Sequence, residues 1–142
     1  MTKHFLILYF STIVTIGVID FLWLNIIAKD FYKDHLDELL EFHMVPAILF
    51  YLIYTVGIVI FANGSPTATW QSALLYGALF GFFAYATYDL SNMATLRGWS
   101  PWLAIVDITW GTLLTAMAAT SGWFIADFFQ KDKTFYNNVA AW

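Results

Sequence analysis

The chain has 142 residues, of which 61% are hydrophobic and only 11% are charged. A soluble domain is about 45–50% apolar and about 25% charged, so this composition excludes an ordinary soluble fold and favours a membrane protein. No cysteine is present, which excludes disulfides, thiolate catalysis and cysteine-based metal sites. The net charge of -4, without a basic run, argues against a nucleic-acid partner.

Four apolar segments follow one another along the chain. A spanning helix needs about 20 mostly apolar residues, and this length is reached by residues 5–28, 43–61, 70–93 and 101–126. Backbone amides in lipid must be bonded within their own segment, so these segments are predicted to be helices. We therefore expect an all-α fold, a polytopic bundle of four transmembrane helices that forms a single membrane domain over residues 1–142.

The connection between the first two spans, residues 29–42, is rich in charged residues. Its apolar residues recur at helical spacing and are Tyr32, Leu36, Leu39 and Leu40. This pattern predicts a short amphipathic helix that lies at the membrane interface with its apolar side towards lipid. A solvated helical extension of a neighbouring span is the alternative.

The orientation in the membrane is nearly balanced. Both termini and the second loop share one side, and the first and third loops share the other, with three Lys or Arg residues on each side. The positive-inside rule therefore does not decide, and the free amino terminus favours cytoplasmic termini. The last residues, 127–142, are polar with interspersed aromatic residues, and we expect this tail to rest on lipid headgroups.

Three aspartates, Asp20, Asp89 and Asp107, lie within the predicted spans. An Asp at the centre of a spanning helix costs about 2.5–3.5 kcal/mol on insertion scales. Each of the three lies close to a helix end, and these ends all open on the side of the first and third loops. At a rise of 1.5 Å per residue, the carboxyl groups are expected roughly 5–12 Å below that surface.

Small residues share helix faces with these carboxyl groups. Gly77, Gly81, Tyr85, Asp89 and Asn92 follow one stripe of the third span. A second stripe, on the fourth span, holds Asp107, Gly111, Thr115, Ala118 and Gly122. Small residues let helices approach closely in membranes, so the carboxyl groups on these faces are expected to point into the bundle.

Asp20 and Trp23 have the same spacing as Asp107 and Trp110. Residues three apart lie on one face of a helix. Each indole is therefore expected to shield the carboxyl group of its own helix, or to donate its N–H to it. Coincidence is the alternative explanation of so short a similarity.

These observations predict an intramembrane site near one interface. The candidates for binding a ligand or a proton are Asp20, Asp89, Asp107, Asn92, Tyr85, Tyr88, Trp23, Trp110 and Arg97. Hard cations prefer carboxylate oxygen, so the candidates for binding a metal are Asp20, Asp89, Asp107 and His43. Binding or transport of a small ligand, a cation or a proton is the favoured function, because intramembrane carboxyl groups often serve it.

Two other functions stay open. A site just below the membrane surface would suit a lipid-modifying enzyme, although no known catalytic spacing is present. The chain could also be an accessory subunit of a larger membrane complex, with carboxyl groups that only make hydrogen bonds between helices. The sequence identifies no cofactor, and the expected partners are the lipid bilayer and either a second copy of the chain or another membrane protein.

Residues 82–99 read FFAYATYDLSNMATLRGW. With the Asp20–Trp23 and Asp107–Gly111 segments, they resemble the signature of the DUF2177 family of small bacterial inner-membrane proteins, whose function is uncharacterised. The resemblance covers nearly the whole chain. It implies a four-helix protein of the bacterial inner membrane and supplies no activity.

Overall fold

The computed structural model describes the backbone of residues 2–140 and the side chains of residues 3–131. Its regular structure there is helical throughout, which confirms the all-α prediction. The four predicted spans are also confirmed, with bounds of Lys3–Ile27, Met44–Asn63, Trp70–Thr95 and Pro101–Lys131. That residues 1–142 form a single domain stays a prediction.

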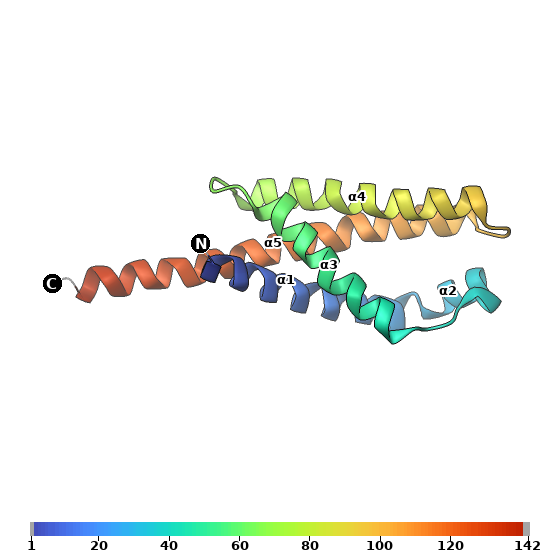
Figure 1. Ribbon diagram of the computed structural model, residues 1–142, viewed down its shortest axis with the longest axis horizontal. Coiled ribbons are helices and arrows are strands. Elements are labelled where there is room, and N and C mark those ends of the chain that lie inside the picture. Colours follow the sequence, from blue (N-terminus) through green and yellow to red (C-terminus); the bar gives the residue numbers. More distant parts are fainter. Residues whose placement is uncertain (1, 141–142) are drawn as a thin grey trace.

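Successive spans run in opposite directions, so that the molecule has two chemically distinct ends (Figure 1). The elements in chain order are α1 (Thr2–Leu22), η1 (Trp23–Ile27), α2 (Lys29–Leu36), η2 (Asp37–Leu39), α3 (Met44–Asn63), α4 (Trp70–Thr95) and α5 (Pro101–Ala140). We call the end that carries α2 and the α4–α5 turn the α2 end. The end that carries the N-terminus and the α3–α4 turn is the terminal end.

The last helix, α5, continues beyond residue 126, where the predicted span ends. The side chains of the predicted tail from residue 132 onward lie outside the described residues, so its contact with headgroups stays a prediction. The starts of α4 and α5 carry side-chain caps. Thr69 and Ser72 form a reciprocal capping box at α4, and Leu103 N donates to Ser100 Oγ at 3.4 Å at α5.

The small residues predicted to face neighbouring helices form the α4–α5 contact. A Cβ atom at Gly77 would lie only 2.8 Å from Ala119 Cβ. Gly81 also has no room for a Cβ, because the carbonyl oxygen of Gly111 and the side chain of Thr115 lie against it. This close approach places the polar residues of α4 and α5 beside one another further towards the α2 end.

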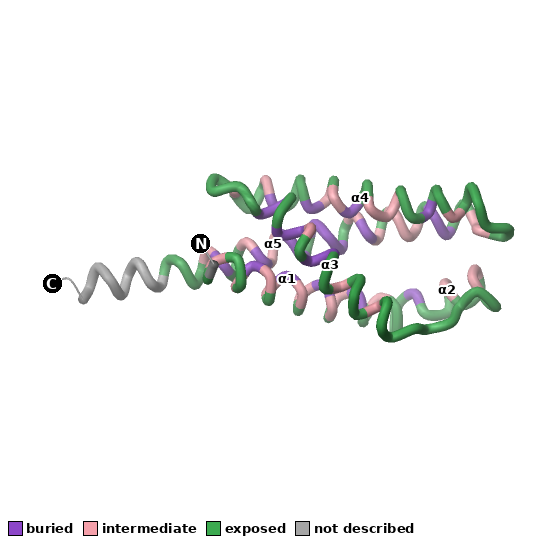
Figure 2. The backbone as a smooth tube through the Cα atoms, viewed as in Figure 1, coloured by how far each residue is buried: buried purple, intermediate pink, exposed green. Residues whose placement is uncertain are grey.

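The buried parts of the backbone lie mainly where the spans cross (Figure 2). The side chains of Ile16, Ile58 and Leu114 are fully buried. Large apolar side chains also face outward, as at Phe10, which is 61% exposed, and Ile53, which is 69% exposed. In water this exterior would drive aggregation. In a bilayer it is the surface that contacts the lipid chains.

The short helix predicted after the first span is present, but one of its side chains points differently. Tyr32 was expected on the lipid side, whereas it turns inward and donates a hydrogen bond to Asp107. The expected orientation of Tyr32 is wrong because a phenol can place its ring against apolar neighbours and still satisfy a buried carboxyl group. Leu39 and Leu40 are exposed, as a lipid-facing side requires. The α-helix α2 ends at Leu36, because the φ of 35° at Asp37 breaks the α-helical geometry where η2 begins.

Candidate functional site

The first carboxyl group, Asp20 on α1, accepts hydrogen bonds from two other spans. The Tyr51 hydroxyl of α3 donates to Oδ2 at 2.5 Å, and Trp110 Nε1 of α5 donates to Oδ1 at 3.0 Å. Asp20 is only 5% exposed. One carboxyl group therefore ties three spanning helices together, as its buried position requires.

The second carboxyl group, Asp107 on α5, is covered by α2. The Tyr32 hydroxyl donates to Asp107 Oδ1, and Trp23 Nε1 donates to the Tyr32 oxygen at 3.2 Å. Burial, followed by the charge of Asp107, raises the pKa of the Tyr32 hydroxyl above its usual value. Tyr32 therefore remains a neutral donor that fastens α2 to the bundle.

The two Asp–Trp pairs act reciprocally across the α1–α5 interface. Trp110 donates to the Asp20 carboxyl group, while Trp23 reaches the Asp107 carboxyl group through Tyr32. The two indoles stack at a centroid distance of 4.2 Å and an interplanar angle of 8°. The expectation that each indole serves its own helix is wrong, because in an antiparallel pair the carboxyl group of one helix stands opposite the indole of the other.

The third carboxyl group, Asp89 on α4, is fully buried. Trp99 Nε1, from the α4–α5 turn, donates to Oδ1 at 3.2 Å. The other oxygen, Oδ2, is buried without a donor among the described residues. The Asp107 carboxyl group lies close enough for a side-chain hydrogen bond with Asp89. Two carboxyl groups can make that bond only when one of them carries a proton, since a carboxylate has no donor.

Tyr85 joins these groups from the middle of α4. Its ring lies directly against Gly111, where a Cβ atom would clash with it. Its hydroxyl group interacts electrostatically with Asp20 and Asp107. Gly111 therefore has a specific role, which is to leave room for an aromatic ring beside Asp20 and Asp107. Asp20, Asp89 and Asp107 are together named here the Asp cluster.

Four predicted residues are less buried than Asp20 and Asp89, namely Tyr88, Asn92, Arg97 and His43. Tyr88 still interacts electrostatically with Asp89 and Asp107. Tyr88 is 57% exposed and makes a hydrogen bond with Asn92 along its own helix. Arg97 is exposed and has no ion pair within residues 3–131. His43 is exposed and lies 3.6 Å from Glu41. Among the described side chains no three metal-ligating groups come together, so the predicted metal set of Asp20, Asp89, Asp107 and His43 is not assembled.

Three participants were not predicted from the sequence: Tyr32, Tyr51 and Trp99. Tyr51 follows the start of α3 by about two turns, which is the depth range used to select the aspartates. The same depth criterion applied to tyrosines would have selected it. Tyr32 and Trp99 lie in connections, and no periodic pattern shows which way a connecting segment folds back.

Four apolar spans, a lipid-facing exterior and two buried aspartates, Asp20 and Asp89, define an integral membrane protein of the α-helical class. The model of a family described as predicted membrane protein (DUF2177) matches residues 5–124. The chain therefore belongs to this family, which confirms the resemblance read from its motifs. No curated protein and no solved structure matches the chain.

Proposed function

We propose that this protein binds a proton at the Asp89–Asp107 pair and exchanges it with water at the α2 end. The observation that carries the proposal is the contact between these two carboxyl groups, one of which has a buried oxygen without a donor. Two negative charges about 4 Å apart repel by about 4 kcal/mol at an effective dielectric constant of about 20. One shared proton removes that repulsion and supplies the missing donor.

The surroundings of the pair support a proton as the neutralising charge. The donors that reach the pair are the neutral side chains of Tyr32 and Trp99. Within the described side chains, the ion pairs lie elsewhere and join Glu41 to His43 and Asp127 to Lys131. A cationic side chain therefore does not replace the proton.

Access to the pair is proposed to come from one side. Asp107 is covered by Tyr32 of α2, so movement of this short helix would open the carboxyl group to the adjacent water. Further towards the terminal end, the next buried polar contact is the bond between the hydroxyl groups of Tyr54 and Thr115, at 2.8 Å, and it contains no carboxyl group. This arrangement favours proton binding over a continuous path through the bundle. With cytoplasmic termini, the pair would open to the outer face of the inner membrane.

The proposal predicts a protonated carboxyl group near neutral pH. Infrared spectra of the protein in lipid vesicles should show the carbonyl stretch of a protonated acid, and the band should vanish in Asp89→Asn and Asp107→Asn. The matched control is Asp34→Asn, which removes an exposed carboxylate of α2 and should keep the band. Absence of the band from the wild type, or its persistence in both variants, would overturn the proposal.

A further inference from the structure

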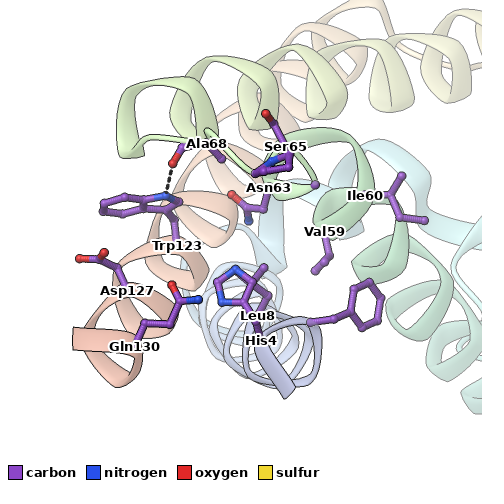
Figure 3. A pocket seen from close by; sticks show the side chains of 13 residues that line it. His4, Leu8, Val59, Ile60, Asn63, Ser65, Ala68, Trp123, Asp127 and Gln130 are labelled. Carbon is purple, nitrogen blue, oxygen red and sulfur yellow. Dashed lines mark hydrogen bonds between the residues drawn. The ribbon is translucent and has the colours of Figure 1, made fainter. Parts of the chain in front are cut away.

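The terminal end of the bundle contains a cavity of about 770 Å³ between the start of α1, the end of α3 and α5. Figure 3 shows that His4, Asn63 and Gln130 approach this space from these three helices. The volume lies within the roughly 300–1,000 Å³ range of small-molecule sites. The cavity is at the opposite end of the spans from the Asp cluster, so what it binds is independent of the proposed proton site.

The polar lining of the cavity contains two atoms that have no hydrogen-bond partner among the described residues. Asn63 is only 4% exposed, and its Nδ2 donates to the carbonyl oxygen of Ala119 at 3.1 Å. That bond fixes the amide, so its Oδ1 is left buried and without a donor. His4 Nδ1 is also buried without a partner. Buried polar atoms are nearly always satisfied, and two orphans on one cavity wall indicate a bound hydrogen-bonding group.

The apolar lining faces the membrane. Leu8 is 3% exposed and Val59 is 1% exposed, so both present fixed apolar walls. Phe5 and Ile60 also line the cavity and are exposed on the lipid-facing side of the bundle. Because His4 and Asn63 lie at the ends of their spans, the polar lining sits at the level of the lipid headgroups. A ligand with a polar head and an apolar chain matches this division.

The available atoms also define the charge and hydrogen-bonding character of the head. Asn63 Oδ1 can only accept a hydrogen bond, and His4 Nδ1 accepts or donates one according to its tautomer, as a hydroxyl group can also do. Trp123 Nε1 is already occupied by the carbonyl oxygen of Ala68 at 2.9 Å. The Asp127 carboxylate is paired with Lys131 at 2.6 Å, so it contributes no uncompensated negative charge. The head must therefore supply donors without carrying a charge, which hydroxyl groups do.

We infer that this cavity binds an amphiphile with an uncharged, hydroxyl-bearing head group, its hydroxyls bonded to Asn63 and His4 and its acyl chain leaving between α1 and α3. A bound phosphate oxygen would offer only acceptors to these atoms. An ammonium group would enter a site whose one carboxylate is already neutralised.

The test is binding of three probes with the same acyl chain to the full-length protein in detergent, measured by native mass spectrometry. The probes are monooleoylglycerol, which has two hydroxyls, methyl oleate, which has none, and oleylamine, which is cationic. Two hydrogen bonds should make monooleoylglycerol bind about tenfold more tightly than methyl oleate. Equal binding of these two probes would contradict the inference, and so would preferential binding of oleylamine.

Variants locate the site. Asn63→Leu and His4→Phe should each reduce the preference for monooleoylglycerol towards that for methyl oleate, while Asp34→Asn at the α2 end should leave it unchanged. Asn63→Leu also removes the bond to Ala119 and could impair folding. His4→Phe keeps a ring of similar size at a helix start, so it decides the question in that case. An undiminished preference in the folded variants would overturn the assignment.

Discussion

The α2 end and the terminal end of this bundle both bury polar side chains, but they satisfy them differently. At the α2 end, Asp20 and Asp107 receive hydrogen bonds from tyrosine and tryptophan side chains of other elements. At the terminal end, Asn63 and His4 line a cavity with atoms that have no partner among the described residues. The first end is a hydrogen-bonded network in which one oxygen, Asp89 Oδ2, lacks a described donor. The second end is a cavity large enough for a molecule.

This difference separates two kinds of binding. Neutral donors around carboxyl groups do not neutralise their charge, so a proton can bind there, and a proton needs no cavity. An opening with unpartnered atoms needs a molecule to complete its hydrogen bonds. Both ends are therefore site candidates for different physical reasons, and mutations should affect them differently.

The largest effect is expected from Asp20→Leu. It leaves the Tyr51 hydroxyl and the Trp110 N–H without their acceptor, and each orphaned donor costs about 1–3 kcal/mol. The free energy of unfolding should fall by about 3 kcal/mol, measured by denaturant titration in detergent. Asp20→Asn is the control, since its amide can accept from Trp110 and donate to Tyr51. An equal loss in both variants would show that charge, not hydrogen bonding, holds this end together.

The next largest effect is expected from Gly111→Ala. A Cβ atom at position 111 meets the Tyr85 ring, so the ring or the α4–α5 contact must shift. Such overpacking costs about 1–3 kcal/mol, which should appear as a lower melting temperature. Gly17→Ala is the matched control, because nothing lies within 4 Å of a Cβ built at Gly17. Similar losses at the two glycines would contradict the specific role of Gly111.

A smaller effect is expected from Tyr32→Phe. Loss of one hydrogen bond to a carboxyl group should weaken the docking of α2 by about 1–2 kcal/mol. Amide hydrogen exchange in α2 should become faster, while exchange in α4 should remain unchanged. Unaltered exchange in α2 would show that the other contacts of α2 hold it in place.

Docking of α2 should also depend on alkaline pH. The pKa of Tyr32 is raised in the folded protein, so the docked state favours the neutral hydroxyl. Docking is fully stable below the usual tyrosine pKa of about 10 and is lost as pH rises above it towards the folded-state pKa. The protection factors of the α2 amides, which correct for base-catalysed intrinsic exchange, should therefore fall at alkaline pH in the wild type. They should stay constant in Tyr32→Phe, and an equal fall in both proteins would exclude Tyr32 as its origin.

The smallest effect is expected from Asp89→Asn. The amide can keep the acceptor for Trp99 and offers Asp107 a donor in place of the shared proton. The melting temperature at neutral pH should be unchanged or slightly higher. A loss of stability comparable to that of Asp20→Leu would show that Asp89, like Asp20, serves to stabilise the fold.

The sequence predicted much of the α2 end because an acidic residue within an apolar span can be recognised from the sequence alone. Asp20, Asp89 and Asp107 stand out by residue type, and their distance from helix ends gives their depth. Their partners were harder to predict, because Tyr32 and Trp99 lie in connections whose folding depends on tertiary contacts. The exchange of indoles between Asp20 and Asp107 likewise depends on how α1 and α5 face each other.

The terminal end was not predicted at all. Asn63 follows the second predicted span, which ends at residue 61, and His4 precedes the first, which begins at residue 5. Neither residue lies within a predicted span, so neither stands out through the cost of burying a charge in lipid. Their significance arises from a cavity between helices, which no helical periodicity describes. Only the assembled bundle reveals it.

The central claim is that Asp89 and Asp107 share one proton, and the pH dependence of stability tests it most directly. If the folded protein holds this proton and the unfolded chain releases it, the free energy of unfolding falls by about 1.4 kcal/mol per pH unit near neutrality. The measurement is denaturant titration of the wild type and Asp89→Asn between about pH 6 and about pH 8. We predict this slope in the wild type and its loss in Asp89→Asn. Identical slopes in the two proteins would contradict the shared proton.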